Sequence, residues 1–169
     1  MAKYAVVRTD DLAGTDVRSQ LVSVKYMGAN GTTPTAIENG NVLKIGALMS
    51  GEREIYVGGA VAANTKLEDV VLIASPEVMY DERKRNLDEF INEAGKTCRG
   101  YHIHKGDSFG VTAEALSGTG TPAVGNIIEL AAGTKLAFAA SATASTTQVG
   151  RIIAIETAGR YTYYVVKVD

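Results

Sequence analysis

Short apolar runs, separated by glycine-rich or polar turns, dominate the hydrophobic pattern of the chain. Several runs alternate apolar and polar residues with a period of two, as residues 21–26 do, which is typical of strands with one buried face. The run at 70–74 is continuously apolar and is followed by Ser75-Pro76, so we expect a strand buried on both faces. The pattern predicts a mainly β protein with a β-barrel or β-sandwich-like fold. Strands are expected at 4–8, 21–26, 42–48, 54–57, 70–74, 108–113, 124–130, 135–139, 149–156 and 161–168.

One segment departs from the β pattern. Its apolar residues Leu87, Phe90, Ile91 and Ala94 are spaced i, i+3, i+4, i+7, which places them on one face of a helix. A glycine follows the last of them, in the position that commonly ends a helix. The spacing therefore predicts one substantial α-helix over residues 81–94, lying on the sheet with this stripe inward.

A short sequence repeat indicates two equivalent strands. The segment VGNII at 124–128 recurs as VGRII at 149–153. Two copies are too few for a solenoid, so we expect a pair of strands in one barrel or sandwich. The glycine in each copy is expected to mark a bulge or a sharp bend. The run of Ser, Ala and Thr at 141–147 predicts a mobile or extended loop.

A chain of 169 residues is long enough to bury a core without disulfides or metals. We expect a single compact domain, or two intimately packed β subdomains with a boundary near 96–107. Cys98 is the only cysteine, so no internal disulfide can form. The first residues lead into a strand-like run rather than a secretion signal, and no apolar window is long enough to cross a membrane. The sequence therefore predicts a protein made and folded in a cytoplasm.

Charge gives no indication of a nucleic-acid partner. The formal net charge is -2, and the only basic cluster, Arg83-Lys84-Arg85, is flanked by acidic residues. A solvated helix face explains that cluster better than a phosphate site. We therefore expect no direct contact with nucleic acid.

The best candidate for a metal site is His102-Ile103-His104. Residues at i and i+2 of a strand share one face, so both imidazoles could reach one ion, with Asp107 or Glu114 as a third ligand. The alternative is a pair of surface histidines that flank a core isoleucine. Because His-x-His alone is a weak signal, we expect no metal and no cofactor.

The sequence also lacks a recognisable catalytic motif. Cys98 follows the end of the predicted helix, whereas thiolates are stabilised at helix N-termini, so a packed cysteine is the better interpretation. Side chains of adjacent residues point in different directions on a strand or a helix. Adjacent carboxylates such as Asp10-Asp11 and Glu68-Asp69 therefore do not by themselves indicate a general acid/base pair. No glycine-rich phosphate loop or nucleophile elbow is present. We therefore expect no catalytic residues and a protein that is not an enzyme.

Five segments of the chain carry a resemblance to a known family. They are MAKYAVVRTD at 1–10, IENGN at 37–41, GERE at 51–54, PEVMYDER at 76–83 and GRYTYYVV at 159–166. Together they resemble the capsid decoration, or cement, proteins of tailed bacteriophages. The resemblance implies a protein that binds the outside of an assembled head through the major capsid protein and strengthens the shell. It implies no catalytic residues, a location on the virion exterior after synthesis in the host cytoplasm, and either a trimer, another homo-oligomer or a monomer.

Two groups of residues are candidates for the protein contact. The first is the N-terminal segment, where Tyr4, Val6 and Arg8 would share one face of a strand that adds to a partner's sheet. The alternative is that this strand pairs internally as an ordinary edge strand. The second group is Tyr161, Tyr163 and Tyr164, because tyrosine suits half-buried positions and interfaces as well as strands.

Two other functions compete with the structural role. One is a carbohydrate- or peptide-binding β module displayed on a particle surface, which should show a concave aromatic cluster. A cement protein should instead show a flat or extended contact surface. The other is a small metal-dependent enzyme built around His102 and His104.

Overall fold

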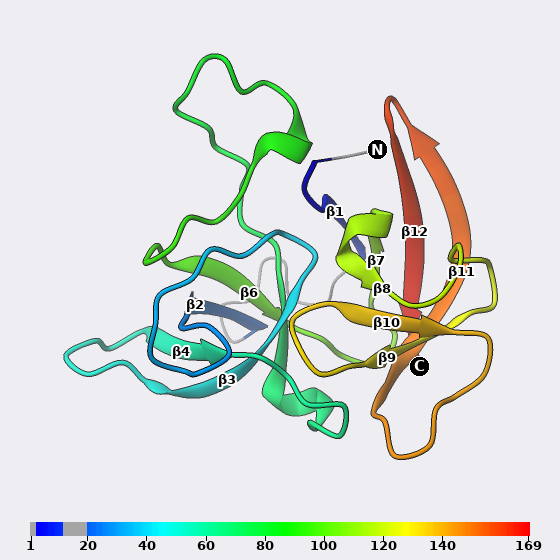
Figure 1. The fold of residues 1–169 in the computed structure, drawn as a ribbon, viewed down its shortest axis with the longest axis horizontal. Helices are drawn as coiled ribbons and strands as arrows, with labels where there is room; N and C mark the ends of the chain where they lie inside the picture. Colours follow the sequence, from blue (N-terminus) through cyan, green and yellow to red (C-terminus); the bar gives the residue numbers. More distant parts are fainter. Residues whose placement is uncertain (1–2, 12–19) are drawn as a thin grey trace.

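The computed structural model describes residues 3–11 and 20–169 and contains two β-sheets (Figure 1). The first sheet is a closed barrel of five strands. All neighbouring strands in it are antiparallel except β2 and β4. In the order in which they pair, they are β2 (Leu21–Tyr26), β4 (Ile55–Gly59), β3 (Val42–Leu48), β5 (Val70–Ile73) and β6 (Cys98–His102), which returns to β2.

The second sheet is open and has seven strands. The chain enters it from the barrel between residues 102 and 108, but the N-terminal strand also belongs to it. Only the pair β10 and β8 is parallel. In order across the sheet, the strands are β1 (Val7–Asp11), β7 (Ser108–Val111), β12 (Tyr161–Val168), β11 (Gln148–Ala158), β9 (Ile127–Leu130), β10 (Leu136–Ala139) and β8 (Leu116–Ser117).

These sheets confirm the prediction of a mainly β protein, and the strands at 21–26 and 42–48 have the predicted bounds. The helical elements of the described residues are short 3₁₀ turns: η2 (Leu67–Asp69), η3 (Leu87–Glu89) and η4 (Ala113–Ala115). Within this part of the chain, no helix is long and apolar enough to cross a membrane.

The prediction of an α-helix over residues 81–94 is wrong. Only η3 is helical there, and the expected stripe does not face the core, since Leu87 and Ala94 are exposed and Phe90 is half-buried. Two tertiary contacts hold this stretch in other conformations: the buried side chain of Asp88 binds groups from distant segments, and the backbone of Asn92 pairs with Ile37. Such contacts override a helical spacing that is only a weak local preference.

Strand β5 lies between two hydrophobic clusters. Val71 and Ile73 point into the barrel, where they pack with Val24, Leu43 and Cys98. Val70 and Leu72 point the other way, into the cluster that the barrel shares with the seven-stranded sheet. All four β5 residues are fully buried, as the continuous apolar run predicts, and each buried side chain contributes about 1.5–3 kcal/mol.

The core shared by the two sheets is the larger of the two clusters. Besides residues of β3, β5 and β6, it contains one face of the open sheet and the start of the chain. The sheet contributes Phe109, Val111, Ile128, Leu130, Leu136, Ile152 and Val166. The barrel and the sheet therefore exclude water from each other's apolar faces.

The two copies of the sequence repeat lie in β9 and β11 or next to them, and these strands are antiparallel neighbours in the open sheet. Ile128 in β9 lies opposite Gly150 in β11, and the backbone of Ile152 exchanges hydrogen bonds with residues 125 and 126. The register of β11 against β9 shifts between Gln148 and Gly150, which fits the expected bulge at this glycine. Gly125 has a φ of 90°, which favours glycine. A Cβ on Gly150 would lie 1.9 Å from the carbonyl oxygen of Lys167, so only glycine fits there.

The loop at 141–147 folds over a buried carboxylate. Glu129 in β9 accepts hydrogen bonds from the backbone N–H of Thr143, at 3.1 Å, and from the hydroxyls of Thr143 and Thr146. Burial opposes the charge on Glu129, but these hydrogen bonds outweigh it and hold the pKa of the carboxyl below its usual range. The loop is therefore tied to the sheet by specific bonds, which the Ser, Ala and Thr composition did not indicate.

We predict that Gly150→Ala lowers the free energy of unfolding by at least about 3 kcal/mol, because the new methyl group meets rigid backbone. Gly59→Ala in β4 is the matched control, since a Cβ there has no neighbour within 4 Å. The control should change stability by less than about 1 kcal/mol. Urea denaturation of both variants tests this, and equal stability of the two would contradict the assignment of Gly150 as a packing constraint.

Candidate functional site: the contact loop and the Asp88 cluster

A long loop at 74–97, between β5 and β6, projects from the barrel and brings η3 next to the start of the chain (Figure 1). We call it the contact loop. Its base is held by buried asparagines. The Asn39 side chain donates to the carbonyl oxygen of Ser75 at 2.8 Å and accepts from its N–H at 3.0 Å. The Asn92 side chain donates to the carbonyl oxygen of Ile37 at 3.0 Å and to Asn39 at 3.1 Å. These bonds satisfy buried polar groups and fix both ends of the loop.

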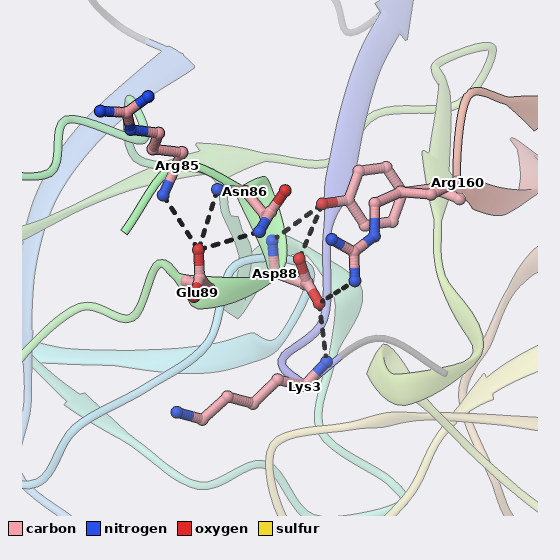
Figure 2. Close-up of polar contacts among 7 residues, drawn as sticks. Lys3, Arg85, Asn86, Asp88, Glu89 and Arg160 are labelled. Carbon is pink, nitrogen blue, oxygen red and sulfur yellow. Dashed lines mark hydrogen bonds and ion pairs between the residues drawn. The ribbon is translucent and has the colours of Figure 1, made fainter. Parts of the chain in front are cut away.

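Asp88 holds the part of the contact loop that faces the start of the chain, as Figure 2 shows, and we call this part, η3 with the residues beside it, the loop tip. One carboxylate oxygen accepts a hydrogen bond from the Tyr161 hydroxyl at 2.7 Å. The other accepts from the Lys3 backbone N–H at 3.1 Å and from Arg160 at 3.4 Å. The Asp88 carbonyl oxygen also accepts from the Tyr4 N–H at 3.1 Å. This group, the Asp88 cluster, joins the loop to the N-terminal segment and to the β11–β12 hairpin.

Electrostatics in the Asp88 cluster favour the ionised carboxylate. Burial opposes its charge, but the hydrogen bonds from Tyr161 and Lys3 and the nearby Arg160 outweigh burial and lower the pKa of Asp88. Burial and the Asp88 carboxylate together raise the pKa of Tyr161. The phenol therefore remains a hydrogen-bond donor at neutral pH.

Local sequence explains why the tip forms a tight turn. One Glu89 carboxylate oxygen accepts hydrogen bonds from the N–H groups of Arg85 and Asn86, at 2.9 and 3.0 Å, and from the Asn86 side chain at 3.1 Å (Figure 2). The Glu89 N–H in turn donates to the Asn86 carbonyl oxygen at 3.0 Å. The hydrogen bonds from Asn86 and Arg85 to the carboxylate lower the pKa of Glu89. Together with the bond from the Glu89 N–H, they resemble a helix N-terminal capping box.

The N-terminal segment pairs within its own sheet. Strand β1 runs antiparallel to β7, with Val7 opposite Val111. Val6 is almost fully buried, and its N–H donates to the Thr112 hydroxyl at 3.1 Å. Tyr4 and Arg8 are half-buried. Val6 therefore contributes to the core, and Tyr4 and Arg8 remain accessible at the sheet edge.

The second predicted group is divided between the core and the surface. Tyr164 packs in the shared core, Tyr163 is buried, and Tyr161 is half-buried in the Asp88 cluster. The rings of Tyr161 and Tyr163 meet edge to face, with centroids 6.3 Å apart. Arg8 lies 5.0 Å from the Tyr163 ring and forms an ion pair with Glu156. The structure thus brings Arg8 from the first group together with Tyr161 and Tyr163 from the second.

Exposed apolar side chains on the contact loop were missed by sequence reasoning. Val78 is 61% exposed, Tyr80 is 95% exposed, and Leu87 lies on the surface near the loop tip. The segment that carries Val78 and Tyr80 is not part of a strand, although its side chains alternate in exposure. The sequence does contain a signal for this exposed pair. Val78 and Tyr80 alternate with other residues after Pro76, but they lie outside every strand that the pattern predicts.

Beneath the contact loop lies an open groove of about 1030 Å³. The loop lines one side with Val78, Tyr80 and Phe90, and strands β2 and β6 line the other with Val22 and Arg99 among others. The groove combines apolar surface with charged groups at its margin. Its lining suits a ligand with an apolar part.

The predicted metal candidates do not form a cluster in the described residues. His102 ends β6 and is half-buried, whereas His104 is exposed after it. Asp107 instead accepts a hydrogen bond from the backbone N–H of His104 at 2.9 Å. In residues 3–11 and 20–169, no three His, Cys, Asp or Glu side chains lie close enough to hold one ion.

Cys98 is a packed residue of the barrel core. Its thiol donates a hydrogen bond to the carbonyl oxygen of Val24 at 3.1 Å, and burial raises the pKa of the thiol to about 12. A thiol with this pKa is almost entirely protonated at neutral pH, so it is a poor nucleophile.

Four segments that are distant in sequence, 1–10, 37–41, 76–83 and 159–166, meet in this region. The Ala5 N–H donates to the Glu38 carboxylate at 3.0 Å, and the Asn39 side chain donates to Glu77 at 3.0 Å. Arg8 lies against the ring of Tyr163.

Comparison of the chain with protein-family models, with curated proteins and with solved structures found no match in any of the three.

We predict that Asp88→Asn destabilises the protein by roughly 1.5–3 kcal/mol at pH 7, because charge-assisted hydrogen bonds are lost. The lowered pKa of Asp88 means that its stabilising effect is present above its unfolded pKa and is lost as pH falls through the folded pKa. The difference between wild type and variant should therefore shrink at strongly acidic pH. Urea unfolding at pH 7 and pH 3 measures this, with Glu82→Gln on the same loop as an exposed control. A difference that does not change with pH would contradict the role of the carboxylate charge.

We also predict that deletion of residues 2–8 destabilises the isolated protein by at least about 3 kcal/mol, because Ala5, Val6 and Val7 leave the core. The double variant Lys3→Ala, Tyr4→Ala keeps these three residues and should lose much less stability. Thermal unfolding of the three proteins is the measurement. A truncated protein as stable as the full chain would show that β1 contributes little to the fold.

Proposed function

We propose that this chain is a non-enzymatic virion structural protein that binds the outer surface of an assembled phage capsid and stabilises it. The observation that carries the proposal is the set of exposed apolar side chains, Val78, Tyr80 and Leu87, on a loop held at its base and its tip. Large apolar groups at the surface favour burial against another protein. The resemblance to capsid decoration proteins directs the proposal to the major capsid protein as that partner.

The rigid attachment of the loop suits a contact surface. Binding is weakened when a loop must be ordered at the moment of contact, and preorganisation reduces that cost. Here the Asp88 cluster and the buried asparagines order the loop in the unbound protein. Tyr80 offers a large ring with a polar tip, a side chain that is enriched among residues dominating binding energies. The Tyr4 N–H and the Tyr161 hydroxyl both bind Asp88, so these two residues lie next to Leu87 of the loop.

The proposed partner presents its surface many times. A decoration protein can bind each site with modest affinity, because many copies share the mechanical load on the shell, and linked copies gain further from multivalent attachment. The net charge of -2 fits a protein that contacts protein on the virion exterior rather than nucleic acid.

The alternative is a carbohydrate- or peptide-binding β module displayed on a particle surface. The groove beneath the contact loop favours this reading, because Tyr80 and Phe90 both line it. A peptide or sugar held there would contact the groove side of the loop, including Phe90. A capsid contact would depend most on Val78 and Tyr80, which are far more exposed than Phe90. Because Val78 and Tyr80 also line the groove, Phe90 is the residue whose substitution distinguishes the two functions.

We predict that Val78→Ser with Tyr80→Ser weakens binding to heads by at least about tenfold, because an apolar anchor is lost. The matched control is Val124→Ser, since Val124 is 59% exposed, close to the 61% of Val78, but lies in another region. Binding isotherms on purified, undecorated heads of the phage that encodes the chain provide the measurement. Thermal unfolding should show that all variants remain folded.

Three results would count against the proposal. If wild-type protein does not bind undecorated heads, the capsid role is wrong. If Val124→Ser weakens binding as much as the double variant, the contact loop is not the binding surface. If Phe90→Ala abolishes binding to a peptide or glycan array while heads are not bound, the alternative function is correct.

A further inference from the structure

Strand β11 leaves part of its outer edge open. It pairs with β12 along its length, from Gly150 to Ala158, but with β9 only near its start. The last backbone bonds on the β9 side are those of Ile152, with Asn126 at 2.9 Å and Gly125 at 2.8 Å. Ile153 is then the extra residue of a bulge, which marks the point where β11 leaves β9. Among the described residues, none forms a backbone hydrogen bond with the outer edge of residues 153–158.

The exposed stretch has the composition of a strand that is normally covered. Ile153 and Ile155 are 47% and 43% exposed. The sequence of 153–158, IAIETA, contains one charged residue, Glu156, which forms an ion pair with Arg8 of the same chain. Strand β1, which lies at one end of the sheet, differs in composition, because VRTDD at 7–11 contains three charged residues in five. Charged residues on edge strands prevent unwanted pairing, so the β1 edge is protected by its composition and the β11 edge is not.

We propose that residues 153–157 of β11 pair with the same residues of a second copy, antiparallel about a twofold axis at Ile155, to form a dimer with a continuous sheet. This inference goes beyond the proposed function and does not depend on it. A contact between identical edges must be self-complementary, because the same residues meet across the axis.

The register follows from charge and side-chain shape. An axis at Ile155 places Ile155 opposite its own copy, Ile153 opposite Thr157, and Ala154 opposite Glu156. Neighbouring β-branched residues across two strands are favourable, and no like charges meet. An axis at Glu156 would place two carboxylates opposite each other, which is unfavourable. The edge of residues 153–157 carries few charges and is therefore compatible with its own copy. A strongly charged partner strand would find few opposite charges on it.

Sedimentation velocity of the full chain, at concentrations up to about 1 mM, tests the association. We expect a dimer, and we expect Ile155→Lys to raise its dissociation constant by at least about tenfold, because two cations would face each other on the axis. Leu48→Lys is the matched control, since Leu48 is a strand residue of the barrel with 46% exposure. It should leave the dimer intact.

A cysteine pair tests the register without adding charge. On an axis at residue 155, the two Cβ atoms of Ile155→Cys would lie about 5 Å apart, whereas those of Thr157→Cys would lie about 13 Å apart. Under mild oxidation the first variant should form a disulfide-linked dimer and the second should not, and the buried Cys98 should not compete. A monomeric wild-type protein, a dimer unaffected by Ile155→Lys, or faster crosslinking by Thr157→Cys would overturn the proposal.

Discussion

The structure depends on the burial of one short strand between two apolar clusters. Each of the four residues of β5 is fully buried, with Val71 and Ile73 inside the barrel and Val70 and Leu72 in the core shared with the open sheet. Because β5 also pairs with β3 and β6, it holds the barrel closed and presents one barrel face to the sheet. A polar residue in this strand would lose water without gaining a partner, so the strand tolerates only apolar side chains.

The position of the contact loop follows from the same arrangement. The loop begins directly after β5, so the strand that organises both cores also fixes where the loop leaves the barrel. The loop has few buried apolar residues of its own, and polar groups therefore set its conformation. Asn39 and Asn92 fix the base, and Asp88 attaches the tip to segments from both ends of the chain. This polar attachment leaves Val78, Tyr80 and Leu87 exposed to solvent.

Local patterns predicted the strands well and the loop poorly. The alternation at 21–26 and the continuous run at 70–74 were informative because burial on one or both faces of a strand is encoded in the side chains themselves. The prediction of a helix over 81–94 failed because it rested on local apolar spacing alone. The conformation of this stretch is set by groups that bind Asp88, and these come from Lys3, Arg160 and Tyr161, which are distant in sequence. Closure of the barrel, including the parallel pair β2 and β4, could not be predicted for the same reason. The exposed pair Val78 and Tyr80 was visible in the sequence, but only the fold shows that no neighbouring strand covers it.

The place of β1 in the open sheet has a consequence for how the chain folds. Its first residue, Val7, pairs with Val111, 104 residues further along the chain, and the whole barrel lies between them in sequence. Closing so large a loop is entropically costly and is associated with slow folding. On the ribosome, the N-terminal segment must remain unpaired until β7 has emerged, and residues such as Val6 stay exposed during that interval. The barrel can form earlier, because its strands span only residues 21–102. Docking of β1 against β7 is therefore expected among the last steps of folding.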